Sequence, residues 1–359
     1  MHLEELTRRS HVSVLIPTYK RAHLIGHVLE ALQKQSYPNF EVLIVLKPSG
    51  DGTERVLESF EEKLNIKVIL QEEGYVTDAL NLGLKYAEGD VIAFLDDDAI
   101  PHKDWLQNHL SMYEEPKIGG VAGNVVPIDL KEGSMDTNSG LSEIIPPRTN
   151  EFMKSTRRIL WGCPIKGMEN HLVYISRAGM VTSDSNLSHR AWNRVTKSLL
   201  GMGANMSLSS EAIKGFKFPR SWILGFAWEQ YLGWYVWKKG YSLVFNPSAV
   251  VNHVVHKQTL SRGRTETKKE VLRVIEDNLL FYRLYGLERD ISGMYRVTWL
   301  VYNLMLSLKK ICRDHQLESF AWIKGTFYSE LIGLKMLVSR KVRGHYCPLT
   351  DFRKLLETN

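Results

Sequence analysis

Cysteine is scarce in this sequence: Cys163, Cys312 and Cys347 are the only three among 359 residues. Their number is odd, their spacing is wide and no two of them form a CxxC pair. Neither a disulfide framework nor a zinc knuckle is therefore indicated. A reducing, intracellular setting fits this composition best.

The sequence also lacks a long apolar run. The longest extends from Val297 to Leu308, is interrupted by three polar residues and is followed by two lysines. A membrane-spanning helix needs about 20 apolar residues, and the polar first ten residues do not resemble a secretory signal. We therefore expect no transmembrane helix and a cytoplasmic location, with peripheral contact at the inner face of the membrane as an alternative.

Several short catalytic motifs are missing as well. The sequence contains no P-loop, HExxH, GxSxG or EF-hand loop. The GxG of residues 201–203 has no third glycine and does not follow the first strand, so it matches a dinucleotide-binding fingerprint poorly.

The composition is otherwise that of an ordinary globular protein, with 44% hydrophobic residues, 24% charged residues and a net charge of +6. The charge is uneven, because residues 301–359 contain ten Lys or Arg and five Asp or Glu. A basic tail of this kind is compatible with nucleic acid, with anionic lipid or with a solvated surface. We expect no nucleic-acid partner.

Apolar segments and helical patterns alternate over the first part of the chain. Strands are expected at 12–17, 40–46, 66–70 and 90–95, and helices at 22–35, 52–64 and 76–87. Strands separated by helices form βαβ units and a parallel sheet, and continuous apolar strands are covered on both faces. The sequence therefore predicts an α/β fold with a mostly parallel central sheet flanked by helices.

Polar segments follow three of the expected strands. Residues 19–21 follow the first strand, residues 47–51 the second and residues 96–98 the fourth. Ligands of open parallel sheets bind beyond the carboxyl ends of the strands. These segments should therefore line one crevice.

The pattern changes after residue 130. Long loops are indicated over 131–194, a helix over 226–239, a strand over 241–245 and further helices beyond residue 267. We expect one domain over 1–286, with halves at about 11–130 and 131–260, and a C-terminal helical region over 287–359. The apolar residues of that region either pack on the domain or rest on a membrane surface; they are Trp299, Tyr302, Leu304, Phe320, Trp322, Phe327 and Leu331.

Asp96, Asp97 and Asp98 form the most informative polar motif. Adjacent carboxylates repel one another unless they are hydrated or bind a cation, and an extended chain points Asp96 and Asp98 the same way. Hard oxygen ligands favour Mg²⁺ or Mn²⁺, ions that proteins commonly share with substrate phosphates. The alternative is a solvated acidic turn in which Asp98 caps a helix that starts near Pro101.

Three further positions are candidates for chemistry. Glu229 lies among aromatic residues, which suits a general base with a raised pKa, or it is a surface residue in the first turn of a helix. His253 is either a metal ligand or a structural histidine. Arg262 and Arg264 lie in a basic loop that either clamps a diphosphate or is a mobile surface loop.

Taken together, these segments resemble inverting glycosyltransferases of family 2, which have the GT-A fold. The resemblance covers roughly Val12 to His256 and rests on the order and spacing of its pieces. They are VSVLIPTYKR (12–21), QSYPNFEVLIV (35–45), SGDGT (49–53), DALNLGLKYAEGDVIAFLDDDA (78–99), GANMSLSSEA (203–212) and WEQYLGWYVWKKGYSLVFNPSAVVNH (228–253).

The resemblance implies a role for each matching residue. Asp96, Asp98 and His253 would hold the divalent cation, with Asp96 near the ribose or a metal-bound water, and Glu229 would be the catalytic base. The residues implied to bind the nucleotide sugar are Pro17, Thr18, Tyr19, Arg21, Lys47, Asn81, Asp96, Asp97, Arg262 and Arg264. The residues implied to lie near the acceptor are Gly203, Asn205 and Trp228.

Two departures from the family pattern are present. Leu46, Lys47 and Pro48 stand where the family usually has Asp-Asp, one of which contacts the base, so the identity of the nucleotide base is open. Trp228 and Glu229 replace Glu-Asp, and glutamate is a longer side chain that can still act as a base.

We therefore expect an enzyme that moves a sugar from a nucleoside-diphosphate sugar to an acceptor hydroxyl, on a glycan or a lipid-linked sugar, with Mg²⁺ or Mn²⁺. A sugar nucleotidyltransferase is one alternative, although residues 17–21 lack the glycine of its basic loop. A catalytically silent sugar-nucleotide-binding module is another.

Overall fold

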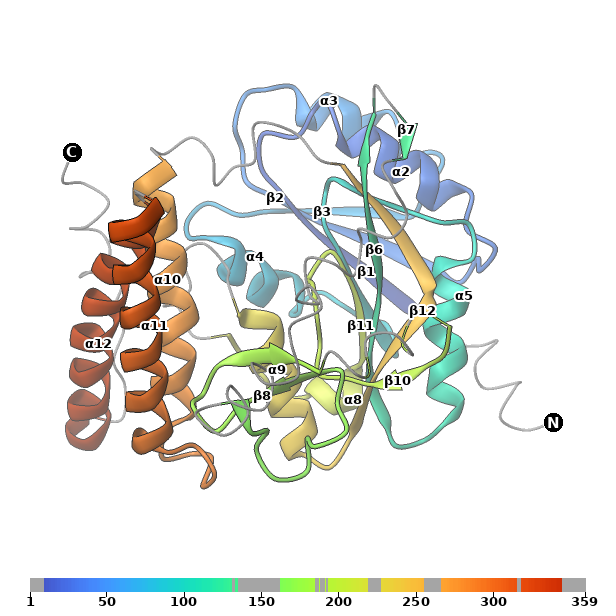
Figure 1. Ribbon diagram of the computed structural model, residues 1–359. Helices are drawn as coiled ribbons and strands as arrows, with labels where there is room; N and C mark the ends of the chain where they lie inside the picture. The colour runs from blue at the N-terminus through green and yellow to red at the C-terminus, as the bar shows by residue number, and fades with distance from the viewer. Residues whose placement is uncertain are drawn as a thin grey trace.

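The computed structural model describes residues 10–130, 133–134, 162–184, 187, 191, 193–218, 227–254, 266–314 and 318–343. Its centre is a mixed, mostly parallel sheet with helices on its faces and a helical bundle at one side (Figure 1). The strand order is β10 (Thr196–Lys197), β12 (Ser242–Val254), β6 (Ile118–Asp129), β11 (Asn205–Ser209), β4 (Val91–Leu95), β1 (Val12–Thr18), β2 (Phe40–Leu46) and β3 (Ile66–Leu70). The expected α/β class with C-terminal helices is confirmed.

The N-terminal strands are parallel and covered on both faces. Val14 and Ile16 of β1 pack with α2 (Ile25–Gln33), whereas Leu15 between them packs with α4 (Val76–Gly83). This alternation explains why the strands are apolar throughout. The helices α2, α3 (Thr53–Glu58) and α4 are shorter than the expected ranges, because the flanking residues form turns.

The helix that we expected near Pro101 begins later. Ala99–Pro101 form the short strand β5, which pairs with β12, and α5 (Trp105–Leu110) starts beyond it. The 3₁₀ helix η1 (Ser111–Glu114) continues from α5. Asp98 therefore caps no helix, so the interpretation of the acidic motif as a helix cap is wrong.

The second half of the sheet adds one antiparallel strand and one long strand. β11 runs antiparallel to both β4 and β6, and it is followed by α8 (Ser210–Ile213). β12 follows α9 (Trp228–Lys238) and is longer than expected, because it pairs with β6 on both sides of a register shift between Asn246 and Val250. β12 continues after the irregularity at Pro247. It therefore extends as far as His253 and Val254. The small strands β7 (Gly133–Ser134), β8 (Val173–Ile175) and β9 (Val181–Ser183) lie outside this path.

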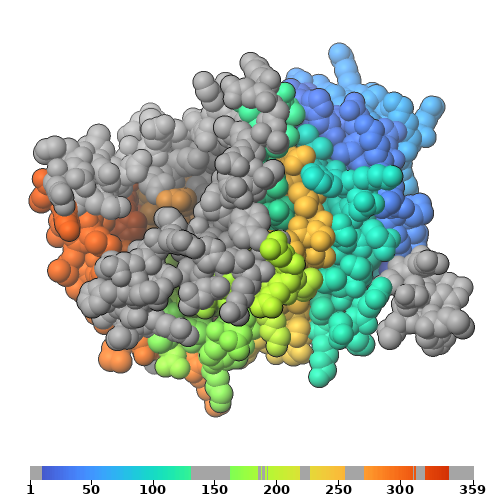
Figure 2. Space-filling model, turned by 45° about the vertical axis from the view of Figure 1, so that its right-hand side comes forward, coloured from blue at the N-terminus to red at the C-terminus, as the bar shows by residue number. Residues whose placement is uncertain are grey.

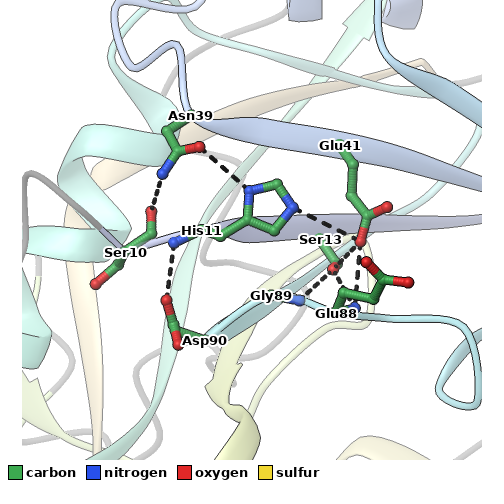
Figure 3. Close-up of polar contacts among 8 residues, drawn as sticks. All are labelled: Ser10, His11, Ser13, Asn39, Glu41, Glu88, Gly89 and Asp90. Carbon is green, nitrogen blue, oxygen red and sulfur yellow. Dashed lines mark hydrogen bonds and ion pairs between the residues drawn. The ribbon is translucent and has the colours of Figure 1, made fainter.

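A polar network ties the amino ends of β1 and β2 to the turn before β4 (Figure 3). The hydroxyl of Ser13 donates to Glu41 Oε1 at 2.6 Å, and the backbone N–H of Gly89 donates to Ser13 Oγ at 2.8 Å. The backbone N–H of His11 donates to Asp90 Oδ2 at 2.9 Å. These bonds account for the buried Glu41 carboxylate, and they lie at the end of the strands opposite to Asp96.

The C-terminal helices form a bundle of α10 (Glu266–Leu284), α11 (Gly293–Asp314) and α12 (Glu318–Arg343). An ion pair between the buried Arg296 and the half-buried Glu330 joins α11 to α12, with Arg296 Nη2 2.5 Å from Glu330 Oε1. Tyr282 of α10 donates its hydroxyl to Glu330. In Figure 2 this bundle (orange) and the N-terminal strands and helices (blue) lie at opposite sides, with the green and yellow segments between them. No helix in the described part of the chain is long and apolar enough to cross a membrane.

Candidate functional site

The acidic segment Asp96–Asp98 directly follows β4, at the carboxyl edge of the parallel strands. Arg21, from the loop after the neighbouring β1, donates from Nε to Asp97 Oδ1 at 3.1 Å and places Nη2 3.3 Å from Asp98 Oδ2. The side chains of all three residues are buried. Parallel pairing of β1 and β4 thus sets a guanidinium against the carboxylates, as the sequence pattern predicted for these two segments.

Asp96, Asp98 and His253 form a cluster whose chemistry suits a divalent cation. One ligand atom from each residue lies within 4.8 Å of the other two. His253 Nε2 is 3.1 Å from Asp98 Oδ1, because β12 places His253 opposite Ala99 of β5. Two carboxylates and one imidazole are ligands of Mn²⁺ and related ions, and three protein ligands leave the remaining positions of such an ion to water or phosphate oxygens.

Burial has the largest effect on the pKa values of Asp96 and Asp97. Burial and the neighbouring Asp98 raise the pKa of Asp96, and the positive charges of His253 and Arg21 only partly oppose this. Burial also raises the pKa of Asp97, although Arg21 lowers it. A cation at this position favours the ionised carboxylates, so the residues present fit a metal ion.

Glu229 stands in the first turn of α9, next to this cluster. Ala227 before the helix has φ +58, a left-handed conformation that is costly for a residue with a Cβ. The backbone N–H of Gly203 donates to Glu229 Oε1 at 3.0 Å. Burial, together with the negative charges of Asp96 and Asp277, raises the pKa of Glu229 to about 8, although hydrogen bonds from backbone N–H groups oppose this. This carboxyl group is therefore a stronger base than an ordinary glutamate.

The three residues expected near the acceptor, Gly203, Asn205 and Trp228, are buried, and their role towards an acceptor stays a prediction. Asn205 is fully buried: its Oδ1 accepts from Trp105 Nε1 at 2.8 Å, and its Nδ2 donates to the carbonyls of Asn124 and Ala249. Trp228 is 6% exposed and packs against Phe94 and other aromatic rings.

Gly203 has a structural reason to be glycine. A Cβ at this position would lie 2.3 Å from Cζ2 of Trp228 and 3.1 Å from Oε1 of Glu229. Gly203 therefore lies directly against both Trp228 and Glu229.

Lys47 directly follows β2 and lies close to residues of the loops after β1 and β3. Its Nζ donates to the carbonyl of Gly74 at 2.8 Å and lies 5.7 Å from the ring centroid of Tyr19 and 5.8 Å from that of Tyr75. Its backbone N–H donates to the carbonyl of Thr18 at 3.0 Å. The ammonium group is thus held between two aromatic rings, an arrangement that stabilises a cation.

The remaining nucleotide-binding candidates differ in how they are placed. Pro17 is half-buried and Thr18 is buried, both at the end of β1. Asn81 uses its side-chain amide on the backbone of Phe218, donating to the carbonyl at 2.9 Å and accepting from the N–H at 2.8 Å. Arg262 and Arg264 lie outside the described residues.

Sequence reasoning did not single out Tyr75 or Gln230, and it included Asp51 only as part of the segment 47–51. Tyr75 forms the second wall around Lys47, and Gln230 fixes the loop before β11 by donating to the carbonyl of Gly201 at 2.6 Å. Asp51 accepts from the backbone N–H groups of Ala22 and Thr53, which outweigh burial and keep its pKa below the ordinary value. Only Asp51 carried a signal, since an aspartate two residues before a helix-starting Thr is a common turn.

Comparisons with known proteins find similarity to glycosyltransferases. Residues 13–176 match the family model described as Glycosyl transferase family 2. The Haloferax volcanii protein named Glycosyltransferase AglE is 36% identical over 118 residues, which are 32% of this chain and 39% of the relative. An Escherichia coli relative named UDP-Glc:alpha-D-GlcNAc-diphosphoundecaprenol beta-1,3-glucosyltransferase WfgD is 30% identical over 153 residues, 42% of this chain and 57% of the relative. The matches thus span less than two thirds of the length of these relatives.

A solved structure extends the similarity of the fold to most of the chain. It is that of residues 1–349 of S. aureus TarS in complex with UDP-GlcNAc, with a TM-score of 0.53 and 17% identity over 88% of this chain and 79% of that chain. The fold is therefore the GT-A fold that the sequence resemblance implied.

Proposed function

We propose that this protein transfers a sugar from a nucleoside-diphosphate sugar to an acceptor hydroxyl. The proposal is supported by the match of residues 13–176 to the model of glycosyl transferase family 2. The transfer inverts the configuration of the anomeric carbon and uses a divalent cation, Mg²⁺ or Mn²⁺. The acceptor class is a glycan or a lipid-linked sugar. The last point is supported by the WfgD relative, whose name specifies a diphosphoundecaprenol-linked sugar as its acceptor.

The observation that carries this proposal is the position of Glu229 beside the acidic cluster. Gly203, which holds Glu229, lies just before β11, and β11 places Asn205 opposite Leu95, the residue before Asp96. The negative charge of Asp96 also raises the pKa of Glu229, which requires the two carboxylates to be close. A cation site for a diphosphate and a base for a hydroxyl are the two groups that a sugar transfer needs.

Asp96, Asp98 and His253 are the residues that would hold the cation. When bound, the cation supplies positive charge against the charge that develops on the diphosphate leaving group. Arg21 keeps Asp97 and Asp98 in place and offsets part of their charge through the contacts at 3.1 and 3.3 Å.

Glu229 is the proposed general base. In its ionised form it accepts the proton of the acceptor hydroxyl, whose oxygen then attacks the anomeric carbon from the face opposite to the leaving diphosphate. The bond from the anomeric carbon to the diphosphate oxygen breaks as the new glycosidic bond forms, so one step inverts the configuration.

The nucleoside part of the donor is assigned to the crevice around Lys47. Tyr19 and Tyr75 provide flat apolar surfaces there, and the Lys47 ammonium provides a hydrogen-bond donor for acceptor atoms of a base or a ribose. Pro17, Thr18 and Asn81 shape the same side of the sheet. Lys47 stands where related enzymes carry an aspartate. The proposal therefore does not specify the nucleotide base of the donor, and its identity is the first property to measure.

The test is a screen of nucleoside-diphosphate sugars with the purified full chain, in which released nucleoside diphosphate is measured with Mn²⁺, with Mg²⁺ and with EDTA. Wild-type protein should release nucleoside diphosphate from one donor class only in the presence of the ion. Asp98→Ala and Glu229→Gln should each lose at least about 100-fold in kcat, as expected for loss of a metal ligand or a general base. The anomeric configuration of the product, read by NMR, tests inversion.

Two outcomes contradict the proposal. Release of pyrophosphate from a nucleoside triphosphate and a sugar phosphate would identify a nucleotidyltransferase. Binding of a nucleotide sugar without turnover, together with unchanged binding by Glu229→Gln, would identify a silent binding module.

A further inference from the structure

The helix α11 exposes a stripe of large apolar side chains. Residues three or four positions apart lie on one face of a helix, and the exposed positions of α11 follow this spacing from Met294, 71% exposed, to Met305, 65% exposed. The stripe consists of Met294, Val297, Val301, Leu304, Met305 and Leu308. The polar and aromatic residues that fix the helix to its neighbours, Arg296 and Trp299, lie on the opposite face and are buried.

The helix α12 exposes a second stripe of the same kind. Its members are Phe320, Phe327, Leu331, Leu334 and Val338, of which Phe327 is 68% and Val338 is 65% exposed. Its other face is buried against α10 through small residues such as Gly333, where a Cβ would lie 2.1 Å from Tyr282. The stripe is therefore not the side that this helix uses for packing.

The two stripes lie on adjacent helices of the bundle. The rings of Trp299 and Trp322 are 5.8 Å apart between α11 and α12, and the Arg296–Glu330 ion pair joins the same helices. Eleven of the eighteen large apolar residues exposed in the described part of the chain are on these two helices. Such a concentration marks an interaction surface, because ordinary surfaces scatter exposed apolar residues singly. We call the two stripes the bundle face.

The charges on this surface have one sign. The exposed charged residues on α11 and α12, where the structure describes their side chains, are Lys309, Lys324 and Lys335. In sequence, α12 ends in Arg340, Lys341 and Arg343. Apolar stripes flanked by lysines are the composition of helices that lie in the interface of a membrane with anionic lipids.

We propose that the bundle face docks on an anionic lipid bilayer surface, with the apolar stripes at the level of the acyl chains and the lysines at the headgroups. The helices rest on the membrane and do not cross it, since none of the described helices is long and apolar enough to span. A second copy of the chain is a poorer occupant, because a two-fold contact brings the same patch of both copies together. The lysines of the two copies would then lie near one another, and Glu330, the one acidic residue of α11 and α12 whose burial the structure describes, is half-buried.

The test is flotation of the full chain with vesicles of phosphatidylcholine alone and of phosphatidylcholine mixed with phosphatidylglycerol. Wild-type protein should float with the anionic vesicles, and binding should weaken as salt screens the headgroup charge. The double variant Phe327→Gln/Leu334→Gln should bind at least about 10-fold more weakly. The double variant Lys309→Gln/Lys324→Gln should bind anionic vesicles about 25-fold more weakly, at about 5-fold per lysine.

A matched control separates this surface from apolar exposure in general. Leu70 of β3 is 61% exposed on the sheet and far along the chain from the bundle, so Leu70→Gln should float like the wild type. All substituted positions are exposed, and circular dichroism should show unchanged helix content. The proposal fails if wild-type protein does not float, if Leu70→Gln weakens binding as much as Phe327→Gln/Leu334→Gln, or if the wild type is a dimer without vesicles that this double variant makes monomeric. None of these measurements depends on the proposed transfer activity.

Discussion

The backbone N–H of Gly203 donates to Oε1 of Glu229 at 3.0 Å, and no side chain fits between the two residues. A Cβ at position 203 would lie 2.3 Å from the ring of Trp228, which is itself buried. The proposed catalytic base is thus held by a glycine that contacts it only through its backbone. Any added atom at position 203 displaces the start of α9.

Gly203→Ala should therefore lower both kcat and the free energy of unfolding. We expect kcat to fall by about 100-fold, since a displacement of about 1 Å at a catalytic group has that effect, and the free energy of unfolding to fall by about 1–3 kcal/mol from overpacking. Gly26→Ala is the control, because its Cβ would meet only Val56 at 3.7 Å inside the helix α2. Equal activities of the two variants would contradict the role of Gly203.

The pH dependence of activity should report Glu229. A base with a pKa of about 8 is mostly protonated at neutral pH, so kcat should rise about ten-fold for each pH unit below 8 and level off above it. Measurement of kcat from pH 6 to 9.5, at saturating donor and cation, checks this. A profile that is flat across neutral pH would contradict the assignment.

The same group predicts how stability changes with pH. The pKa of Glu229 is raised from its ordinary 4.5 to about 8 in the folded protein, so the folded state favours the neutral form. The associated stability is complete below pH 4.5 and is lost as pH rises towards 8. Glu229→Gln should not show this loss, so the difference in Tm between the variant and the wild type should grow in favour of the variant between these pH values. A constant difference would contradict a raised pKa.

Metal binding should depend on His253. This residue is distant from Asp96 and Asp98 in the sequence, and the pairing of β12 with β5 places it beside them. His253→Ala removes the nitrogen that lies 3.1 Å from Asp98 Oδ1, and we expect Mn²⁺ affinity, measured by calorimetry, to fall at least about 10-fold. His27 is exposed on α2, so His27→Ala should bind Mn²⁺ like the wild type. Unchanged affinity of His253→Ala would remove this histidine from the site.

These residues also show what the sequence alone could predict. The buried strands β1, β2 and β4 were expected because strands covered on both faces are apolar without interruption, and the positions of Arg21 and Asp96–Asp98 followed from the parallel sheet. The expected strand over 241–245 covers only the first part of β12 and ends before His253. His253 was therefore placed by family resemblance and not by the predicted elements.

Burial explains the remaining differences. Asn205 and Trp228 lie in a segment near the site, but whether a side chain faces the crevice or the core depends on packing between distant segments, which local sequence does not encode. The C-terminal aromatic residues divide in the same way: Trp299 is buried within the bundle, whereas Phe320 and Phe327 are exposed. Core packing therefore holds for one face of this region, whereas contact of the exposed face with a membrane stays a proposal.

Lys47 should affect donor binding more than turnover. Lys47→Ala removes the ammonium that Tyr19 and Tyr75 flank, so KM for the donor should rise about ten-fold while kcat and Mn²⁺ affinity change little. Lys67 of β3 has its Nζ 5.1 Å from the ring centroid of Tyr86. Lys67→Ala is therefore a control for the loss of a lysine–tyrosine contact. A fall in kcat with unchanged KM would place Lys47 in the chemical step instead.

The bundle should depend on the ion pair between Arg296 and Glu330. The Arg296 side chain is 3% exposed and its Nη2 lies 2.5 Å from Glu330 Oε1. Glu330→Gln leaves this guanidinium buried without a carboxylate, and loss of one partner of a buried pair costs about 3 kcal/mol or more. Denaturant unfolding of the full chain measures the change.

Glu211→Gln is the matched comparison, because Glu211 and Lys214 are an exposed pair with their side chains 68% and 74% accessible. Its removal should change the free energy of unfolding by less than about 1 kcal/mol. If Glu330→Gln unfolds like Glu211→Gln, the bundle is held by its apolar contacts alone. If it unfolds in a separate early transition while the Mn²⁺ site remains, the bundle is an independent folding unit attached to the sheet domain.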